Sequence, residues 1–231
     1  MFVADVEVPA LDERDGHHLL RVLRLRPGQT ISVADGTGRW RLCALHSSRP
    51  EGRSASATLE PVTDAVDDPE PHPALTVAFA PTKGERPQWA VAKLTELGVD
   101  RIIPLVTARS VVRWDESSPE RRHLRWAEVA RQSAMQSRRV RLPEIDPPTE
   151  VAQVAGAAGT SAVLAVPGGD RPTLDHPTVL IGPEGGWSRD EELAVTATVG
   201  LGPLVLRTET ATVAVTSLYV ALRTGLVVKA P

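Results

Sequence analysis

The chain has 231 residues, of which 42% are hydrophobic, so it is long enough to build one large domain or two small ones around a sizeable core. This composition argues against an intrinsically disordered chain. The formal net charge is only -3, so binding to nucleic acid would need a local basic patch, because the chain as a whole is slightly acidic.

Cys43 is the only cysteine, which excludes an intrachain disulfide and a structural zinc site built on cysteines, and we expect no metal. Cys43 alternates with apolar neighbours, so we predict a small core residue in a strand. The start of the chain, 1–16, is acidic and lacks the basic and apolar segments of a signal peptide. No apolar run approaches the roughly 18 residues that cross a bilayer. We therefore expect a soluble, cytoplasmic protein with no membrane partner.

The first 70 residues are predicted to form a small β-rich domain. A short helix over 17–26 is followed by strands over 30–34, 39–45 and 57–62. The turn Asp35-Gly36-Thr37-Gly38 joins the first two strands as a hairpin. The next segment, 63–73, is acidic and contains prolines, which cannot continue a helix or a central strand. We interpret it as a linker.

In the second domain, 71–231, strands alternate with helices, which predicts a parallel α/β sheet. The expected strands cover 75–80, 101–106, 161–166, 179–181 and 204–206. The expected helices cover 87–97, 119–137, 149–158, 189–199 and 211–223, and Ser117 or Ser118 is the expected cap of the second. The last helix is apolar nearly all round, so it is expected in the core or in a subunit interface.

Two glycine-rich turns follow strands of this domain. The first, 182–186, precedes a helix that Ser188 and Glu191 are expected to start as a capping box. The second, 200–211, offers Thr208 or Thr210 as the cap of the last helix. Ligands bind where the strands of an open α/β sheet end, so paired turns favour a binding site over two ordinary connecting loops.

The sequence lacks the motifs of phosphate and dinucleotide sites, of serine hydrolases and of zinc proteases. The ligand is therefore predicted not to be held by its phosphates. Arg207 and Glu209 flank the second turn, either as a surface ion pair or facing a substrate. Lys83 follows the first strand of the sheet, either as a plain exposed lysine or as a ligand contact. An arginine-rich stretch is either a solvated helix face or a phosphate-binding surface: Arg121, Arg122, Arg125, Arg131, Arg138, Arg139 and Arg141.

Several segments resemble those of the RsmE-type methyltransferases, and the resemblance spans nearly the whole chain. Its most specific parts are Ile181-Gly182-Pro183-Glu184-Gly185-Gly186 and Leu206-Arg207-Thr208-Glu209-Thr210-Ala211. The other matching segments are His17-His18-Leu19, Val22-Leu23-Arg24 with Gly28, Lys83, Lys93-Leu94-Thr95-Glu96-Leu97-Gly98-Val99, Arg109-Ser110 and Trp126.

The resemblance implies a PUA-like RNA-binding domain over 1–70 and a SPOUT methyltransferase domain over 71–231, whose C-terminal chain threads a trefoil knot. It further implies a homodimer that methylates N3 of a specific uridine in 16S rRNA of the small ribosomal subunit, with S-adenosyl-L-methionine as cofactor. The residues that it implies for cofactor binding are Val166, Pro167, Ile181, Gly182, Pro183, Glu184, Gly185, Gly186, Leu201, Gly202, Leu206, Arg207, Thr208 and Ala211.

For catalysis, Glu209 is the candidate base and Arg207 or Arg139 the candidate stabiliser of the uracil anion, while Glu184 either orders its loop or faces the base. The candidate RNA-binding residues are His18, Arg21, Arg24, Lys83, Lys93, Arg138 and Arg139. The chain departs from the family at Leu204, where an arginine is usual, and at Met135-Gln136, where a Glu-Gln pair is usual.

Two other functions fit the same residues. The chain could be a non-catalytic RNA-binding module, or a methyltransferase of the same fold that acts on a different RNA or a different atom. The two signatures describe the cofactor site better than the target site.

Overall fold

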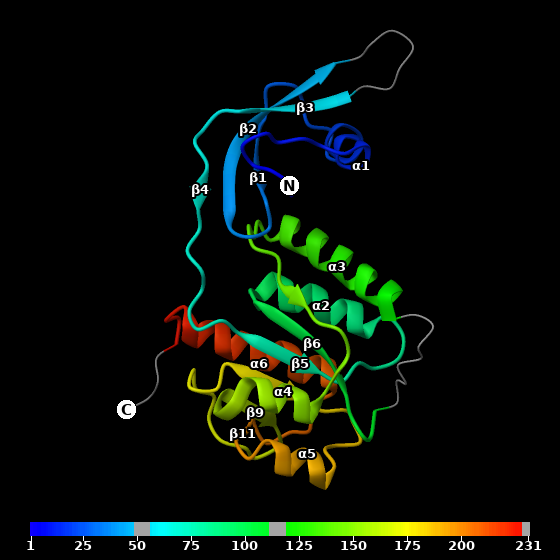
Figure 1. Ribbon diagram of the computed structural model, residues 1–231, viewed down its shortest axis with the longest axis vertical. Coiled ribbons are helices and arrows are strands. Elements are labelled where there is room, and N and C mark those ends of the chain that lie inside the picture. The colour runs from blue at the N-terminus through cyan, green and yellow to red at the C-terminus, as the bar shows by residue number, and fades with distance from the viewer. Residues whose placement is uncertain (49–55, 111–118, 228–231) are drawn as a thin grey trace. The chain divides into compact units, whose positions relative to one another are not determined.

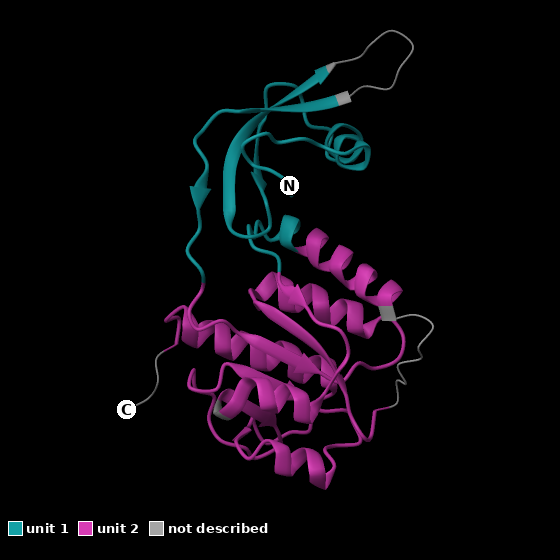
Figure 2. Ribbon diagram, viewed as in Figure 1, with its two compact units in different colours: residues 1–70, 134–142 teal, residues 71–133, 143–231 magenta. Residues whose placement is uncertain are grey.

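The computed structural model describes residues 1–48, 56–110 and 119–227 (Figure 1). The chain divides into two compact units (Figure 2). The first comprises Met1–Glu70 and Ala134–Leu142, and the second comprises Pro71–Ser133 and Pro143–Pro231. The predicted serine cap at position 117 or 118 lies outside the described residues.

The first unit is built on an antiparallel sheet in the order β1-β2-β3, with β4 paired to the start of β2. Its strands are β1 (Thr30–Ala34), β2 (Arg39–Ser48), β3 (Ser56–Pro61) and β4 (Val66–Asp67). The first three confirm the predicted strands. β4 lies inside the predicted linker, so that prediction is wrong at these two residues. A two-residue strand at the end of a sheet tolerates nearby prolines because it needs few ladder hydrogen bonds.

The N-terminal helix begins earlier than predicted. It consists of α1 (Glu13–His17) and a π-helical turn, η1 (His18–Val22). Asp12 caps it, since the Asp12 carboxylate accepts a hydrogen bond from the Asp15 amide at 2.6 Å. Arg24 then adopts a left-handed conformation with φ of 52°, which ends the helix before the predicted boundary at position 26.

The core of the first unit lies between its sheet and the N-terminal segment. Val3, Val6, Val33 and Cys43 form one buried cluster, so the prediction that Cys43 is a core residue is confirmed. Burial raises the pKa of the Cys43 thiol above its ordinary value, because the thiolate would lose its hydration.

The returning segment Ala134–Leu142 completes this unit. Ala134 is buried with Phe2 and Ala34, and Leu142 packs against them. The Arg141 guanidinium donates hydrogen bonds to the carbonyl oxygens of Thr37 and Asp68. This contact explains Gly38 in the predicted hairpin turn: its φ is 114°, and a Cβ there would lie 2.3 Å from the guanidinium.

Arg138 holds a left-handed conformation with φ of 60°, two residues after the end of α3 (Pro119–Gln136), where glycine is favoured. We expect Arg138→Gly to stabilise the protein by about 1 kcal/mol, since a non-glycine residue in this region costs ~1–2 kcal/mol. The urea midpoint of unfolding measures this effect. Arg121→Gly, in the regular part of α3, is the control and should destabilise. A lower midpoint for Arg138→Gly would contradict the prediction.

The second unit contains a parallel sheet in the order β11-β9-β10-β5-β6-β7, with β8 also paired to β6. Its strands are β5 (Thr76–Phe79), β6 (Arg101–Val106), β7 (Glu144–Ile145), β8 (Thr149–Glu150), β9 (Ala162–Ala165), β10 (Thr178–Ile181) and β11 (Thr198–Val199). The central strands are buried on both faces, as expected for a parallel sheet covered by helices. The predicted α/β class with a parallel sheet is therefore confirmed.

Helices cover both faces of this sheet (Figure 1). One core cluster contains residues of α2 (Arg86–Leu97), α3 (Pro119–Gln136) and α6 (Thr208–Arg223). The other contains residues of α4 (Val151–Ala158) and residues that flank α5 (Arg189–Ala194). A short 3-10 turn, η2 (Gly159–Ser161), follows α4. Alternate residues of a strand point to opposite faces: Val77 and Phe79 pack with α2 and α6, whereas Ala78 packs with α4.

The segment after α5 differs from the prediction. The helix expected over 189–199 ends at Ala194, and Thr198–Val199 form β11 beside β9. The run from Val195 to Val199 is rich in β-branched residues, which favour extended backbone, and Val195 and Val199 are buried there. The strand expected over 204–206 does not form, and Leu204 and Val205 are 73% and 85% exposed.

The remaining boundaries agree with the predictions to within a few residues. α2 ends at Gly98 in the left-handed conformation, as predicted. α4 begins two residues later than expected because Thr149–Glu150 pair with β6, and α6 begins three residues earlier. α6 packs against α2 and the sheet through Val215 and Tyr219, and burial raises the pKa of Tyr219 to about 12.

Candidate functional site

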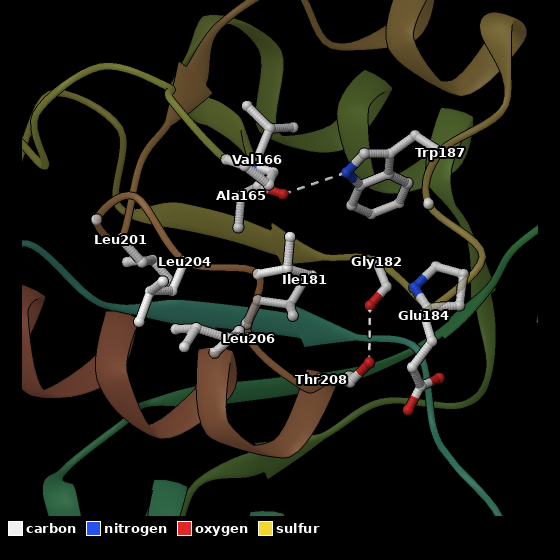
Figure 3. A pocket seen from close by; sticks show the side chains of 16 residues that line it. Ala165, Val166, Ile181, Gly182, Glu184, Trp187, Leu201, Leu204, Leu206 and Thr208 are labelled. Carbon is white, nitrogen blue, oxygen red and sulfur yellow. Dashed lines mark hydrogen bonds between the residues drawn. The ribbon is translucent and has the colours of Figure 1, made fainter.

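Three neighbouring strands of the second unit, β11, β9 and β10, end at the same edge of the sheet, and the loops that follow them enclose a cavity of about 180 Å³ (Figure 3). The β10 loop carries the first glycine turn, and the β11 loop carries the second. Ligands of parallel α/β sheets bind at this edge. The paired turns predicted from the sequence therefore meet at one cavity, although the second follows β11 and not a strand over 204–206.

The cavity wall contains every residue predicted to bind a cofactor except Gly185 and Arg207. Gly185 lies against Arg109, and its carbonyl accepts a hydrogen bond from Arg109 Nη1 at 3.0 Å. Arg207 is exposed and precedes α6 as its N-cap residue. Four lining residues were not predicted: Ala165, Trp187, Leu204 and Val205.

Trp187 forms part of the wall and explains why position 182 is glycine. The Trp187 ring is 7% exposed, and its Nε1 donates to the Ala165 carbonyl at 3.3 Å (Figure 3). A Cβ on Gly182 would lie 2.9 Å from the ring. The sequence signal was available, since Trp187 directly follows the glycine turn. Glu184 is exposed, and its side chain extends away from Trp187 (Figure 3).

The helix after the first turn begins as predicted. Ser188 and Glu191 form the capping box, with the Ser188 amide donating to Glu191 Oε2 at 2.7 Å. Glu191 Oε1 also accepts from the Ala108 amide at 2.9 Å, which ties the β10 loop to the segment after β6. This second contact is long-range and had no local signal.

The predicted cap of α6 is wrong, since neither Thr208 nor Thr210 caps the helix with its side chain. The Thr208 hydroxyl instead donates to the Gly182 carbonyl at 3.0 Å (Figure 3). Thr208 is 4% exposed at this position. The bond joins the two glycine turns, so it fixes the relative position of two walls of the cavity.

The loops after β9 and β11 cross with no room for side chains. The Val166 amide donates to the Val199 carbonyl at 2.9 Å, and the Gly200 amide donates to the Asp170 carbonyl at 2.8 Å. A Cβ on Gly200 would lie 2.4 Å from the Gly169 carbonyl oxygen. Glycine is therefore required at this crossing by the close approach of two backbones.

Glu209, one residue after Thr208, is a largely buried candidate catalytic group, whereas Arg207 is exposed. Its side chain is 16% exposed, and its Oε1 lies 3.6 Å from Arg86 Nη1. Its Oε2 is buried and has no hydrogen-bond partner among the residues that the structure describes. Arg139, the third candidate, belongs to the first unit, whereas Arg207 and Glu209 belong to the second.

The candidate RNA-binding residues are divided between the units. Lys83 and Lys93 lie in the second, where the Lys93 ammonium pairs with Glu96 at 2.7 Å and Lys83 is exposed. The others lie in the first: His18, Arg21, Arg24, Arg138 and Arg139. In the ranges 1–48, 56–110 and 119–227, no group of three or more metal-ligating side chains gathers.

Comparisons with known proteins agree with this architecture. A family model described as an RNA methyltransferase domain matches residues 69–220, and one described as an RNA methyltransferase PUA domain matches residues 11–49. A ribosomal RNA small subunit methyltransferase E from Mycobacterium bovis is 34% identical, over 88% of this chain and 82% of its own length. This chain belongs to the RNA methyltransferase family that includes that enzyme.

Other members of the family are similar over comparable lengths. The protein of the same name from Bacillus subtilis is 27% identical over 84% of this chain and 82% of its own. The crystal structure of the Neisseria gonorrhoeae protein, bound to S-adenosyl methionine, has a TM-score of 0.77 and 26% identity over 98% of this chain and 96% of its own. The predicted family is confirmed, as is its α/β methyltransferase fold with a PUA-like domain, and the SPOUT assignment and the knot stay predictions.

Proposed function

We propose that this RNA methyltransferase uses S-adenosyl-L-methionine to methylate N3 of a specific uridine in 16S rRNA of the small ribosomal subunit. The observation that carries the proposal is the cavity formed by the three loops at the strand ends. It is built from the two segments with the strongest family resemblance, at the edge of the sheet where α/β proteins bind ligands.

The cavity suits this cofactor better than a phosphate ligand. Its walls are largely apolar, because they contain Val166, Ile181, Leu201 and Leu206. The glycines of the two turns place no bulky side chains beside their backbone groups. Such walls suit a flat, uncharged purine ring. The Neisseria gonorrhoeae relative was solved with S-adenosyl methionine bound. When bound, the cofactor supplies a methyl group on a positively charged sulfur.

The chain itself must activate the base, because uracil N3 carries a proton and is a weak nucleophile until that proton leaves. Glu209 accepts the proton at its unpaired Oε2. Arg207 or Arg139 stabilises the negative charge that then spreads onto the ring oxygens. The methyl group would pass to N3 as its bond to the sulfur breaks, leaving a neutral thioether, and the proton would end on the Glu209 carboxylate and then in solvent.

The other parts of the proposal concern assembly and RNA binding. Arginines of the first unit and Lys83 hold RNA phosphates. The exposed apolar side chains Leu204, Val205 and Leu218 support a homodimer, because large exposed apolar groups mark interfaces. The crossing at Gly169 and Gly200 supports a trefoil knot. None of the helices in the described ranges has the length and apolar character needed to cross a bilayer. We place the enzyme in the cytoplasm with its ribosomal substrate.

Two measurements test the proposal. Titration calorimetry should detect S-adenosyl-L-methionine binding to the purified protein. If no binding is detected, the result would favour a non-catalytic RNA-binding module. Mass spectrometry of 16S rRNA from a deletion strain should show the loss of one N3-methyluridine, which the wild-type gene restores. Loss of a different methylated nucleoside would identify a methyltransferase with another target and overturn the uracil assignment.

A further inference from the structure

A second cavity in the second unit lies beside the first turn of α6. Its volume is about 610 Å³, within the ~300–1,000 Å³ of typical ligand sites. α2 contributes Arg86 and Trp89, α3 contributes Arg125 and Val129, and α6 contributes Glu209. The sequence singled out Glu209 as a candidate catalytic residue and Arg125 as part of the arginine-rich stretch, and it gave no role to Arg86, Trp89 or Val129.

Trp89 gives this cavity an aromatic wall. It is 47% exposed, whereas Trp126 and Trp187, in the same unit, are 4% and 7% exposed. A tryptophan left open in a cavity wall is a stacking surface for a flat ring, and nucleobases stack on such side chains regardless of sequence. Arg86 and Arg125 line the same cavity, and each lies near a carboxylate, that of Glu209 and Glu85 respectively, so the charges of the lining balance.

The α3 side of the cavity is held in place by polar contacts. The Gln88 amide, oriented by its hydrogen-bond network, donates to the Glu85 carbonyl at 2.9 Å and accepts from Arg125 Nε at 3.3 Å. Arg125 Nη2 also lies 3.8 Å from the Glu85 carboxylate. These contacts orient Arg125 before any ligand arrives.

Glu209 supplies an acceptor that the described residues leave unused. Its Oε2 is buried without a partner there, while its Oε1 is 3.6 Å from Arg86 Nη1. A buried acceptor without a donor has lost its hydration and gained no hydrogen bond in return, so a ligand with a matching donor is favoured. The Glu209 carboxylate and the Arg86 guanidinium therefore offer a ligand a hydrogen-bond acceptor next to hydrogen-bond donors.

We propose that this cavity holds the target uracil, flipped out of its RNA stack, with its ring on Trp89, its N3–H donated to Glu209 and a ring oxygen accepting from Arg86. In uracil the N3–H donor lies between two carbonyl acceptors, which matches the carboxylate acceptor of Glu209 beside the guanidinium donor of Arg86. Cytosine has a lone pair at N3, which would face the carboxylate and be rejected. The cavity is therefore expected to bind uracil in preference to cytosine.

The cavity also has the right place along the chain for the reaction, and this inference rests on the proposed function. Thr208 lines the cofactor cavity and Glu209 lines this one, and consecutive Cα atoms are only about 3.8 Å apart. The two cavities therefore share the first turn of α6 as a wall. Base flipping is the general solution for enzymes that act on a base.

The test uses the full-length protein and labelled oligouridylate and oligocytidylate of equal length, with binding measured by fluorescence anisotropy. Oligouridylate should bind about tenfold more tightly, equivalent to ~1.4 kcal/mol. Trp89→Ala should weaken oligouridylate binding about tenfold, and Trp89→Phe should restore most of it. Glu209→Gln should bring the two affinities together, because the amide can donate to cytosine N3. Glu192→Gln, which removes a first-turn glutamate from α5, should change neither.

Equal wild-type affinities, or a preference for uracil that survives both Trp89→Ala and Glu209→Gln, would overturn the inference. Methylation of ribosomal RNA by the wild-type protein is measured in parallel. If methylation occurs without the predicted discrimination, the inference fails and the proposed function stands. If discrimination depends on Glu209 and Trp89 but no methyl transfer occurs, the cavity binds uracil and the proposed function fails.

Discussion

Glu209→Gln is expected to slow methyl transfer about 10²–10⁴-fold, the usual contribution of a positioned proton acceptor. The glutamine keeps the shape of the side chain but cannot take the N3 proton at Oε2, which is the unpaired atom. The measurement is a single-turnover assay on unmethylated small ribosomal subunits with saturating S-adenosyl-L-methionine. The cofactor affinity should change little, because Glu209 does not line the cofactor cavity.

Glu192→Gln is the matched control, since it removes an exposed glutamate from the first turn of α5. It should retain the wild-type rate. The same assay on Arg207→Ala and Arg139→Ala identifies the arginine that stabilises the uracil anion. A near-wild-type rate for Glu209→Gln with cofactor bound would show that the base is another group, and the catalytic assignment would be wrong.

Gly200→Ala is expected to have the largest effect on stability, lowering the free energy of unfolding by about 3 kcal/mol, at the upper end of overpacking substitutions. The added Cβ would lie 2.4 Å from the Gly169 carbonyl oxygen and 3.0 Å from Gly169 C, and both belong to the backbone. A backbone neighbour cannot move aside as a flexible side chain can. Urea denaturation followed by circular dichroism measures the loss.

The same substitution should weaken cofactor binding, because Leu201 and Gly202 line the cavity immediately after the crossing. Gly156→Ala is the control: its Cβ would meet nothing within 4 Å inside α4, and alanine is the better helix former by about 1 kcal/mol. It should stabilise the protein slightly and leave cofactor binding unchanged. Equal stability of Gly200→Ala and the wild type would show that the two loops can separate without cost.

Much of the secondary structure could be predicted because its signals are local. β6 has the predicted bounds, since an apolar run of that length between turn residues has few alternatives. Gly98 ends α2 in the left-handed conformation, and Ser188 caps α5 through Glu191. These features depend on residues within one or two helical turns of each other, so they can be predicted from the sequence.

The errors occur where distant residues decide the conformation. Val195 to Val199 follow a helix with no glycine or proline to end it, yet β11 forms because β9 offers an open edge. Thr208 has the chemistry of a helix cap, but its hydroxyl reaches Gly182, 26 positions away. Val66–Asp67 pair with β2 inside a segment whose composition indicated a linker. Local propensity is a weak guide when long-range pairing is available.

By itself the sequence determined the α/β class, the β-rich N-terminal part, the family and the two glycine turns, because each depends on local periodicity or on contiguous motifs. Only the tertiary structure decided that Thr208 joins those turns, that Gly169 and Gly200 cross without room for a Cβ, and that Trp89 and Arg86 share a cavity with Glu209. Glu209 lies 120 positions from Trp89 in the chain, as their residue numbers show. Contacts at such separations follow from how helices pack on the sheet, and no local pattern encodes that packing.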